Sequence, residues 1–278
     1  MGATLAISNL ADSATLTTTS GTMLRALSQM QIAWARGLAR GPSNYSAGVT
    51  TLTLRIDLGS AKQWSALGLI GVNAAYSGGS ASFSNTAFGN TDRGTASLEN
   101  LLAGGNSHGN SLWYVNSTFV TCRYIQIYIE VFNLPSGLQH VDIRRLFVAS
   151  ADGSASTTAV FSDGVDFDWS LTHVDLSSVD VTPRGGVFTS PQGTYRELRF
   201  GISGMTAAEA LNLRTWIATA RRTTECVISM RDDTTADAQA KNTIYGRLVD
   251  WAPIQHDGGD YYSCESIIVH ETPHPPLS

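Results

Sequence analysis

Two stretches of the chain alternate between apolar and polar residues, at positions 50–58 and 120–131. Successive side chains of a β-strand point to opposite faces of its sheet, so a period of two predicts half-buried strands. The residues expected on the buried faces are Leu52, Leu54, Ile56 and Leu58, and then Ile125, Ile127, Ile129 and Val131. The chain is therefore expected to build sheets that bury one face, which places it among mainly β proteins.

The segment after the first of these strands predicts a turn followed by a second strand. Residues 59–62 form a short polar break, and residues 64–73 are mostly apolar with glycines at 68 and 71. Glycine inside a strand is typical of places where another backbone approaches closely. Residues 75–110, by contrast, are rich in Gly, Ser and Asn, and this composition predicts long surface loops.

One segment of the second half has a helical pattern. Residues 206–222 place apolar side chains at the three- and four-residue spacing of one helix face. Thr206 and Glu209 have the spacing of a capping box, in which two side chains satisfy free backbone groups at the start of a helix. The flanking segments predict strands, so the second half is expected to be an antiparallel β domain with one helix packed across it. The helix residues expected to be buried are Ala210, Leu213, Trp216, Ile217 and Ala220.

The length of 278 residues favours two domains, each large enough to bury a core of its own. A segment rich in Gly, Ser and Thr, residues 151–158, separates two complete sets of predicted strands. We therefore expect a β-sandwich over residues 1–150 and a second β domain over residues 159–278.

The composition excludes several classes of partner. The net charge is −5 and the 18 Lys and Arg are scattered, so we expect no specific binding of nucleic acid. No segment has the length and character of a membrane span, and the first twenty residues lack the regions of a secretory signal. Only 15% of the residues are charged while Gly, Ser, Thr and Ala are abundant, which suits a surface that is either hydroxylic or covered by copies of the same chain. The three cysteines, Cys122, Cys226 and Cys264, predict reduced core thiols rather than disulfides.

The sequence offers few groups for chemistry. Carboxylates cluster at Asp163, Asp166 and Asp168, where a calcium loop and a solvated start of a strand are both open interpretations. The six histidines show no metal-binding spacing, and no nucleophile elbow or phosphate-binding glycine loop occurs. We therefore expect no catalytic centre, no cofactor and no metal, and the chain is not predicted to be an enzyme.

Five aromatic residues fall in or beside the Gly-, Ser- and Asn-rich segments, and two interpretations of them stay open. Exposed rings among short polar side chains can grip the face of a sugar or contact a neighbouring subunit. The same rings can instead fold inward and hold long loops in place. The candidate residues are Tyr76, Phe83, Phe88, Trp113 and Tyr114.

The first half, residues 9–149, resembles the galactose-binding-like jelly rolls of discoidin type, in particular versions found in tailed-phage proteins. The resemblance rests on "IDLGSAKQWSALGLIGVN" at 56–73, and on "CRYIQIYIE" at 122–130 followed by "VDIRRLFVA" at 141–149. In the family these segments are core strands at the two ends of the sandwich, so the resemblance implies that they are scaffold. The family often binds glycans through its loops, but no residue-level sugar motif is shared here.

The second half resembles a domain of phage distal-tail and tail-tube-like proteins, in which a β-sandwich with one flanking helix joins a ring around the tail axis. The order of strands and helix from Phe167 to Glu271 carries this resemblance, without any invariant motif. The domain order departs from that of distal tail proteins, which usually place the ring domain first.

Together the resemblances imply a structural component of a bacteriophage tail tip or baseplate, made in the bacterial cytoplasm and carried in the virion. The second domain would form a ring of six copies, or of three in a fibre-attached role, in contact with tube, hub and fibre proteins. Residues 195–203 and 226–233 carry few charges at their edges and are expected to pair between copies. The jelly roll would lie at the periphery, within reach of a cell-surface glycan. The alternative is a carbohydrate-binding receptor-recognition module outside any ring.

Overall fold

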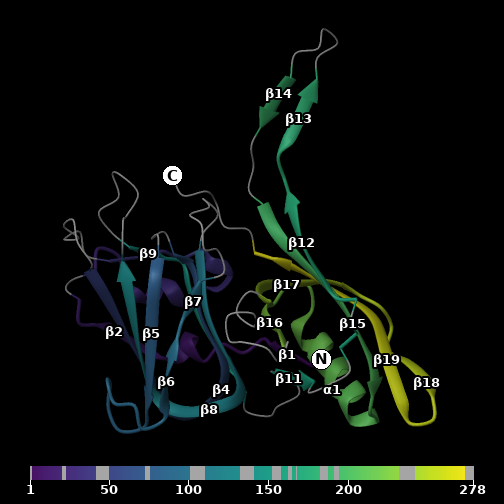
Figure 1. The fold of residues 1–278 in the computed structure, drawn as a ribbon, viewed down its shortest axis with the longest axis horizontal. Helices are drawn as coiled ribbons and strands as arrows, with labels where there is room; N and C mark the ends of the chain where they lie inside the picture. The colour runs from purple at the N-terminus through teal and green to yellow at the C-terminus, as the bar shows by residue number, and fades with distance from the viewer. Residues whose placement is uncertain are drawn as a thin grey trace.

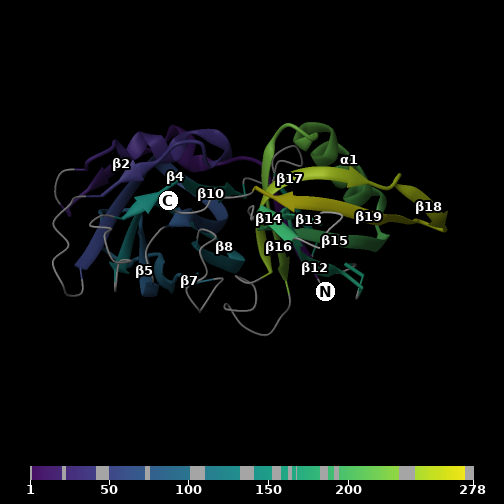
Figure 2. The ribbon, with the colours of Figure 1, turned by 90° about the horizontal axis from the view of Figure 1, so that it is seen from above.

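Two β-sheet bodies lie side by side in the computed structural model, as the views in Figure 1 and Figure 2 both show. The strands pair antiparallel throughout the described residues, and the predicted mainly β fold with one α-helix is confirmed. The structure describes residues 2–20, 23–41, 50–72, 76–100, 110–131, 141–151, 158–161, 165–166, 168–181, 187–190, 194–231 and 242–272.

The first body is a seven-stranded antiparallel sheet closed over one core, in the order β10-β4-β8-β5-β6, with β2 on β4 and β7 on β8. Its two longest strands, β4 (Thr50–Val72) and β8 (Asn110–Val131), pair along their lengths and bend together (Figure 1). Leu54 and Leu69 lie on either side of the bend in β4 but belong to one buried cluster, so the bent strands enclose a shared core. The other elements of this body are η1 (Leu10–Ser13), β2 (Thr15–Thr18), η2 (Leu27–Gln31), η3 (Ala33–Ala35), β3 (Ala39–Arg40), β5 (Tyr76–Ser84), β6 (Gly94–Ser97), β7 (Glu99–Asn100), β9 (Asp142–Ile143) and β10 (Arg145–Ser150).

The predicted alternation of buried and outward side chains is confirmed in β4 and β8. Leu54 lies opposite Ile127, and Ile56 opposite Ile125, and all four side chains are buried. Burying one such side chain contributes about 1.5–3 kcal/mol. The turn expected at residues 59–62 is instead a bend within one continuous strand, where Gly59 has a φ of +78° that glycine adopts without strain.

The expectation of long surface loops over residues 75–110 is wrong for residues 76–84, 94–97 and 99–100, which form strands, whereas residues 85–93 do form a largely exposed connection. The strands are β5, β6 and β7, and β5 pairs with both β8 and β6. Ala81 and Phe83 of β5 are buried in the core. Ser and Gly have low intrinsic preference for strands, but a place between two partner strands outweighs that preference.

The second body is an eight-stranded sheet in the order β11-β1-β16-β17-β19-β15-β12, with β18 paired to β19. A separate two-stranded ribbon, β13 with β14, continues beyond β12 and β15. The elements are β1 (Gly2–Ala6), β11 (Thr158–Phe161), β12 (Ser170–Asp175), β13 (Ser178–Val181), β14 (Val187–Ser190), β15 (Thr194–Met205), α1 (Ala207–Ala220), β16 (Glu225–Arg231), β17 (Thr243–Trp251), β18 (Gln255–Gly258) and β19 (Tyr261–Glu271).

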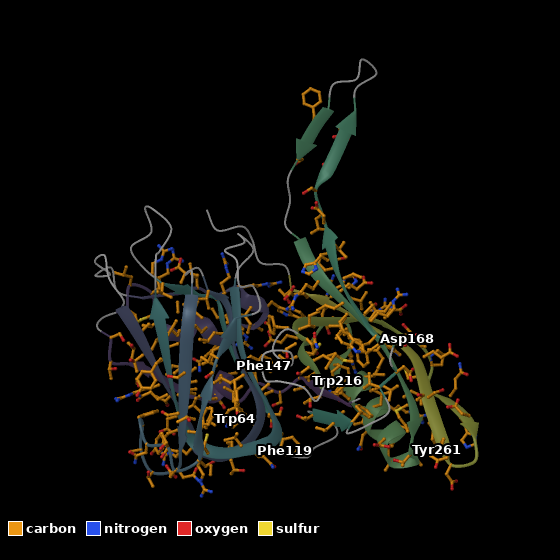
Figure 3. The ribbon with its side chains drawn as sticks, viewed as in Figure 1. Trp64, Phe119, Phe147, Asp168, Trp216 and Tyr261 are labelled. Atoms are coloured by element: carbon orange, nitrogen blue, oxygen red, sulfur yellow. The ribbon has the colours of Figure 1, made fainter. Side chains whose placement is uncertain are left out.

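The predicted helix is confirmed as α1, and so is its capping box. The Thr206 hydroxyl accepts from the backbone N–H of Glu209 at 3.3 Å, and the Glu209 carboxylate accepts from the backbone N–H of Thr206 at 2.9 Å. All five predicted core residues of the helix are buried. Trp216, labelled in Figure 3, lies among them with no exposed surface, so the helix is held by its apolar face.

The first strand of the chain does not lie in the body that follows it in sequence. β1 pairs with β16 from Gly2 opposite Arg231 to Ala6 opposite Val227, and with β11 on its other side. The expected assignment of residues 1–150 to one unit is therefore wrong for residues 2–6. Leu5 has no exposed surface and belongs to the core of the second sheet. Burial of this side chain favours that place for β1, although the first body follows β1 directly in the sequence.

The two strands expected to offer free edges are interior strands. β15 pairs with β12 on one side and with β19 on the other, and β16 pairs with β1 and β17. The sheet ends instead at β12 and β11 among the described residues. β15 and β16 are therefore paired on both sides within the sheet, and they leave no edge free for pairing with another copy.

An apolar cluster joins the two bodies. Phe147 of β10 and Tyr245 of β17 meet edge to face with ring centroids 5.9 Å apart, and both are buried. Figure 3 shows Phe147 between the two bodies. The remaining members are small or aliphatic side chains that allow the sheets to approach closely: Ala6, Ala66, Ile70, Ala149 and Val227.

A buried arginine lies beside this apolar cluster and pairs with both bodies. The Arg145 guanidinium has no exposed surface and donates to both carboxylate oxygens of Asp12, at 2.5 and 2.9 Å, and to the Glu225 carboxylate. Glu225 also accepts from the Tyr245 hydroxyl and from the backbone N–H of Trp34, the latter at 2.8 Å. Burial raises the pKa of Asp12, and the bonds from Arg145 offset this only in part.

Replacing Arg145 by Ala is expected to lower the free energy of unfolding by about 3–5 kcal/mol, because it leaves the Glu225 carboxylate buried without its cation. Denaturant titration followed by fluorescence measures the loss. The control is Arg222→Ala, whose partner Asp250 lies 3.3 Å away with both side chains mostly exposed. That variant is expected to change stability by less than about 1 kcal/mol. Equal losses in the two variants would contradict the role given to the buried pair.

Candidate functional site

Two of the five candidate aromatic residues lie in the core of the first body. Phe83 meets Trp64 edge to face with centroids 4.9 Å apart, and Tyr114 stacks on Phe83 at 5.7 Å. The Trp64 indole N–H donates to the Cys122 sulfur at 3.2 Å. Phe83 is 1% exposed, so its ring serves packing and is not available to a sugar.

Phe88 is the candidate that the structure places at the surface. It lies half-buried in the connection that joins β5 to β6. Its ring meets Tyr124 edge to face with centroids 4.9 Å apart, and the Arg55 guanidinium lies 5.2 Å from its ring centre. The Arg123 guanidinium lies 4.7 Å over Tyr124 and pairs with Asp57 through two bonds of 2.8 and 2.9 Å. We call Arg55, Asp57, Phe88, Arg123 and Tyr124 the outer-face cluster.

The remaining two candidates are placed by their backbones only. Tyr76 lies in β5 opposite Val131, and Trp113 lies in β8 opposite Gly68. Their side chains fall outside the described part of the structure. The five candidates therefore do not form one site among the described residues.

Sequence reasoning missed the partners of Phe88. Arg55 and Tyr124 come from β4 and β8, far from Phe88 in the chain. Each occupies an outward position of an alternating strand, and this pattern was available in the sequence. What the sequence lacked was the fold of the 85–93 connection, which brings Phe88 onto that face.

The acidic candidates do not form a metal site in the described residues. Asp166 accepts a hydrogen bond from the Ser203 hydroxyl, Asp168 lies in a turn, and Asp163 is outside the described residues. Across the described ranges, no group of three or more His, Cys, Asp or Glu side chains is arranged to hold a metal ion. No helix among them has the length and apolar character to span a membrane.

The histidines that are described make local contacts. His256 bonds the carbonyl of Gly259 at 2.8 Å, and His270 bonds the Glu197 carboxylate at 2.8 Å. His173 is exposed in β12 opposite Arg196. His108, His140 and His274 lie outside the described residues.

The prediction of reduced core thiols is confirmed for all three cysteines, which are free and buried. Burial raises the pKa of Cys122 to about 11 and that of Cys226 to about 12, and it also raises the pKa of Cys264. A thiol with such a pKa remains protonated at neutral pH, so it is neither a ready nucleophile nor a metal ligand.

The most prominent surface feature is a long hairpin that projects from the second body (Figure 1). Its lower part is β12 paired with β15, and its upper part is β13 paired with β14, from Ser178 opposite Ser190 to Val181 opposite Val187. We call residues 170–181, 187–190 and 194–199 the arm. In Figure 3 the β13 and β14 ribbon lies well beyond both bodies.

The arm exposes apolar side chains away from any core. Phe188 is 65% exposed and Leu176 is 43% exposed, and residues of both faces of β12 are exposed. A two-stranded ribbon by itself is marginally stable in water, because it can bury only little apolar surface. The upper arm therefore has the properties of a segment that is stabilised by contact with another surface.

Comparisons with known proteins identify no family. No protein-family model matches the sequence, and no curated protein matches it.

Solved structures match the chain at low sequence identity and low TM-score. The chain is similar to SpGH29 with a TM-score of 0.36 and 11% identity, over 51% of this chain and 28% of that chain. It is similar to the family 32 carbohydrate-binding module of NanJ from C. perfringens in complex with galactose, with a TM-score of 0.37 and 15% identity, over 52% of this chain and 98% of that one. A fucolectin from striped bass (Morone saxatilis) serum has a TM-score of 0.32 and 11% identity, over 97% and 99% of the two chains. The likeness is one of fold and transfers no binding residue.

Alanine variants are expected to separate the core aromatic residue from the surface one. Phe83→Ala removes a buried ring from contact with Trp64 and should cost about 3–5 kcal/mol of unfolding free energy. Phe88→Ala, the matched control, removes a half-buried ring and one contact with an arginine, and should cost about 1–2 kcal/mol. Denaturant titration of both variants measures the difference. A larger loss for Phe88→Ala would show that the two rings have been assigned the wrong roles.

Proposed function

We propose that this protein is a structural subunit of a bacteriophage tail tip or baseplate, joined to neighbouring copies through the arm. The single observation that carries the proposal is the projecting arm, with Phe188 exposed on its β13–β14 ribbon and Leu176 exposed between β12 and β13. In a monomer, the described residues of this ribbon belong to neither hydrophobic core. In an oligomer the same apolar side chains become buried, and the ribbon gains the support that it lacks alone.

The assembly proposed is a closed ring, of six copies or of three. A heterologous contact closes on itself when the rotation between copies is a whole fraction of a turn. The arm of one copy would lie against the next, and the sheet edges at β12 and β11 would be covered in the process. This arrangement replaces the one expected from residues 195–203 and 226–233, because β15 and β16 are interior strands.

The order of elements in the second half adds support from the resemblance to distal-tail and tail-tube-like domains. Such a ring would contact tube, hub and fibre proteins, and the virion would be its location. The first body would face outward and present its surface, including the outer-face cluster, to fibres or to the cell.

The second candidate function is recognition of a cell-surface glycan by the first body, outside any ring. The observation that favours it is the outer-face cluster, where the half-buried Phe88 ring contacts Tyr124 and Arg55, and Tyr124 in turn carries the Arg123–Asp57 pair. Sugar-binding sites commonly combine an aromatic ring with charged hydrogen-bonding groups. This candidate requires no contact between copies.

Phe188→Asp is expected to shift the protein from oligomer to monomer at equal concentration, because it places a charge in the apolar contact proposed for the arm. Sedimentation velocity measures the shift, and electron microscopy of the wild type should show six-fold or three-fold rings. The control is Leu211→Asp, which changes an equally exposed apolar residue on α1 and should leave the oligomer intact.

A wild-type protein that stays monomeric at high concentration and is absent from phage particles would overturn the ring. Glycan-array binding by that monomer, lost in Phe88→Ala, would then support the second candidate.

A further inference from the structure

A cavity of about 720 Å³ opens beside the foot of the arm. Its walls come from η3 of the first body, from the residues after α1, and from β15, β17 and β19 of the second body. Volumes of about 300–1,000 Å³ are typical of pockets for small ligands. The cavity is distinct from the outer-face cluster, which lies on β4 and β8 of the first body.

The walls carry an excess of positive charge. Arg36, Arg222 and Arg247 all line the cavity and are exposed. Arg222 pairs with Asp250 in an exposed contact and lies over the Trp251 ring at 5.8 Å, and no described carboxylate pairs with Arg36 or Arg247. In a chain of net charge −5, three arginines around one cavity form a local site for an anion.

The acidic group in the cavity wall is already engaged. The Glu271 carboxylate accepts from the Arg196 guanidinium at 2.5 and 2.9 Å, so it does not neutralise the three arginines. His270, also in the wall, bonds Glu197. The anion that the arginines can bind must therefore come from outside the described residues.

The cavity also offers aromatic surface held in place by the junction. Trp34 has a φ of 65°, which is uncommon for a residue other than glycine. Its backbone N–H bonds Glu225 at 2.8 Å, and this contact with the second body supports the unusual conformation. Tyr195, on the arm side of the cavity, lies against the His270 ring with centroids 4.8 Å apart. Rings of this kind pack against the apolar face of a sugar.

A buried polar group in the same wall lacks a partner. The Thr272 hydroxyl oxygen is buried and makes no hydrogen bond among the described residues. A buried hydroxyl without a partner is costly, and native structures usually satisfy such groups. A ligand with a hydroxyl or carboxylate oxygen would provide the missing partner.

We propose that this cavity binds a sugar acid, with the carboxylate held by the arginines and the ring against Trp34 and Tyr195. Guanidinium groups bind planar carboxylates through two parallel hydrogen bonds, so these three arginines are suited to hold one. The sugar hydroxyls would satisfy the Thr272 hydroxyl. Every wall residue comes from one copy of the chain, so the cavity is complete in a monomer, although the ring proposal assigns Leu176 of its wall to the contact between copies.

The test is titration calorimetry of the full chain with glucuronic acid and with N-acetylneuraminic acid. At least one of them should bind in a saturable way, and galactose, which lacks the carboxylate, should not compete. Arg247→Gln and Arg36→Gln should each weaken binding about tenfold or more, since each removes a charge-assisted bond. The control Arg214→Gln changes an exposed arginine of α1 outside the cavity and should bind as the wild type does. Thermal unfolding should be the same in all three variants.

Three outcomes would overturn the proposal. The first is no binding of either sugar acid by the wild type. The second is binding that Arg214→Gln weakens as much as Arg247→Gln. The third is equal competition by inorganic phosphate or by a glutamate-rich peptide, which would assign the site to another anion. None of these outcomes bears on the oligomer measured with Phe188→Asp, so the two proposals fail separately.

Discussion

The arrangement of the two bodies depends on the buried guanidinium of Arg145. It bonds Asp12 in η1, the carbonyl of Met30 at 3.2 Å in η2 and Glu225 in β16. Burial acts against its charge, but the bond to Asp12 and the attraction of Glu225 outweigh this and raise the pKa of Arg145. Glu225 in turn holds the backbone of Trp34, so the same interaction that joins the bodies also shapes the cavity between them.

The crossing of β1 into the second sheet has a consequence for how the chain works as a unit. Because β1 lies between β11 and β16, the start of the chain and its second half form one sheet, and the first body is a continuous insertion between β1 and β11. Together with the contact of Phe147 and Tyr245, this gives the two bodies a fixed relation. A jelly roll anchored in this way is suited to present a surface at a defined place on an assembly.

Much of the fold was predictable wherever side-chain periodicity reflects burial. Positions 52, 54 and 56 of β4, positions 125, 127 and 129 of β8, the five buried positions of α1 and the buried thiols were assigned correctly. Leu58 is only partly buried, and the side chain of Val131 lies outside the described residues. The strands at 76–100 were not predicted, because their Ser, Gly and Ala residues have little preference of their own and depend on neighbouring strands. The candidate aromatic residues were found by composition, which does not distinguish Phe83 in the core from Phe88 at the surface.

The sequence by itself determined a mainly β chain in two parts, a capped helix, reduced thiols and the absence of recognisable catalytic motifs, since these follow from local spacing and residue type. Only the tertiary structure decided which strands are interior and placed β1 in the distant sheet. It also decided that the arm projects, and that Arg36, Arg222 and Arg247 line one cavity. The physical reason is that these features depend on pairings between residues far apart in the chain. Local periodicity carries no information about such partners, which are selected by the burial and hydrogen bonding of the whole fold.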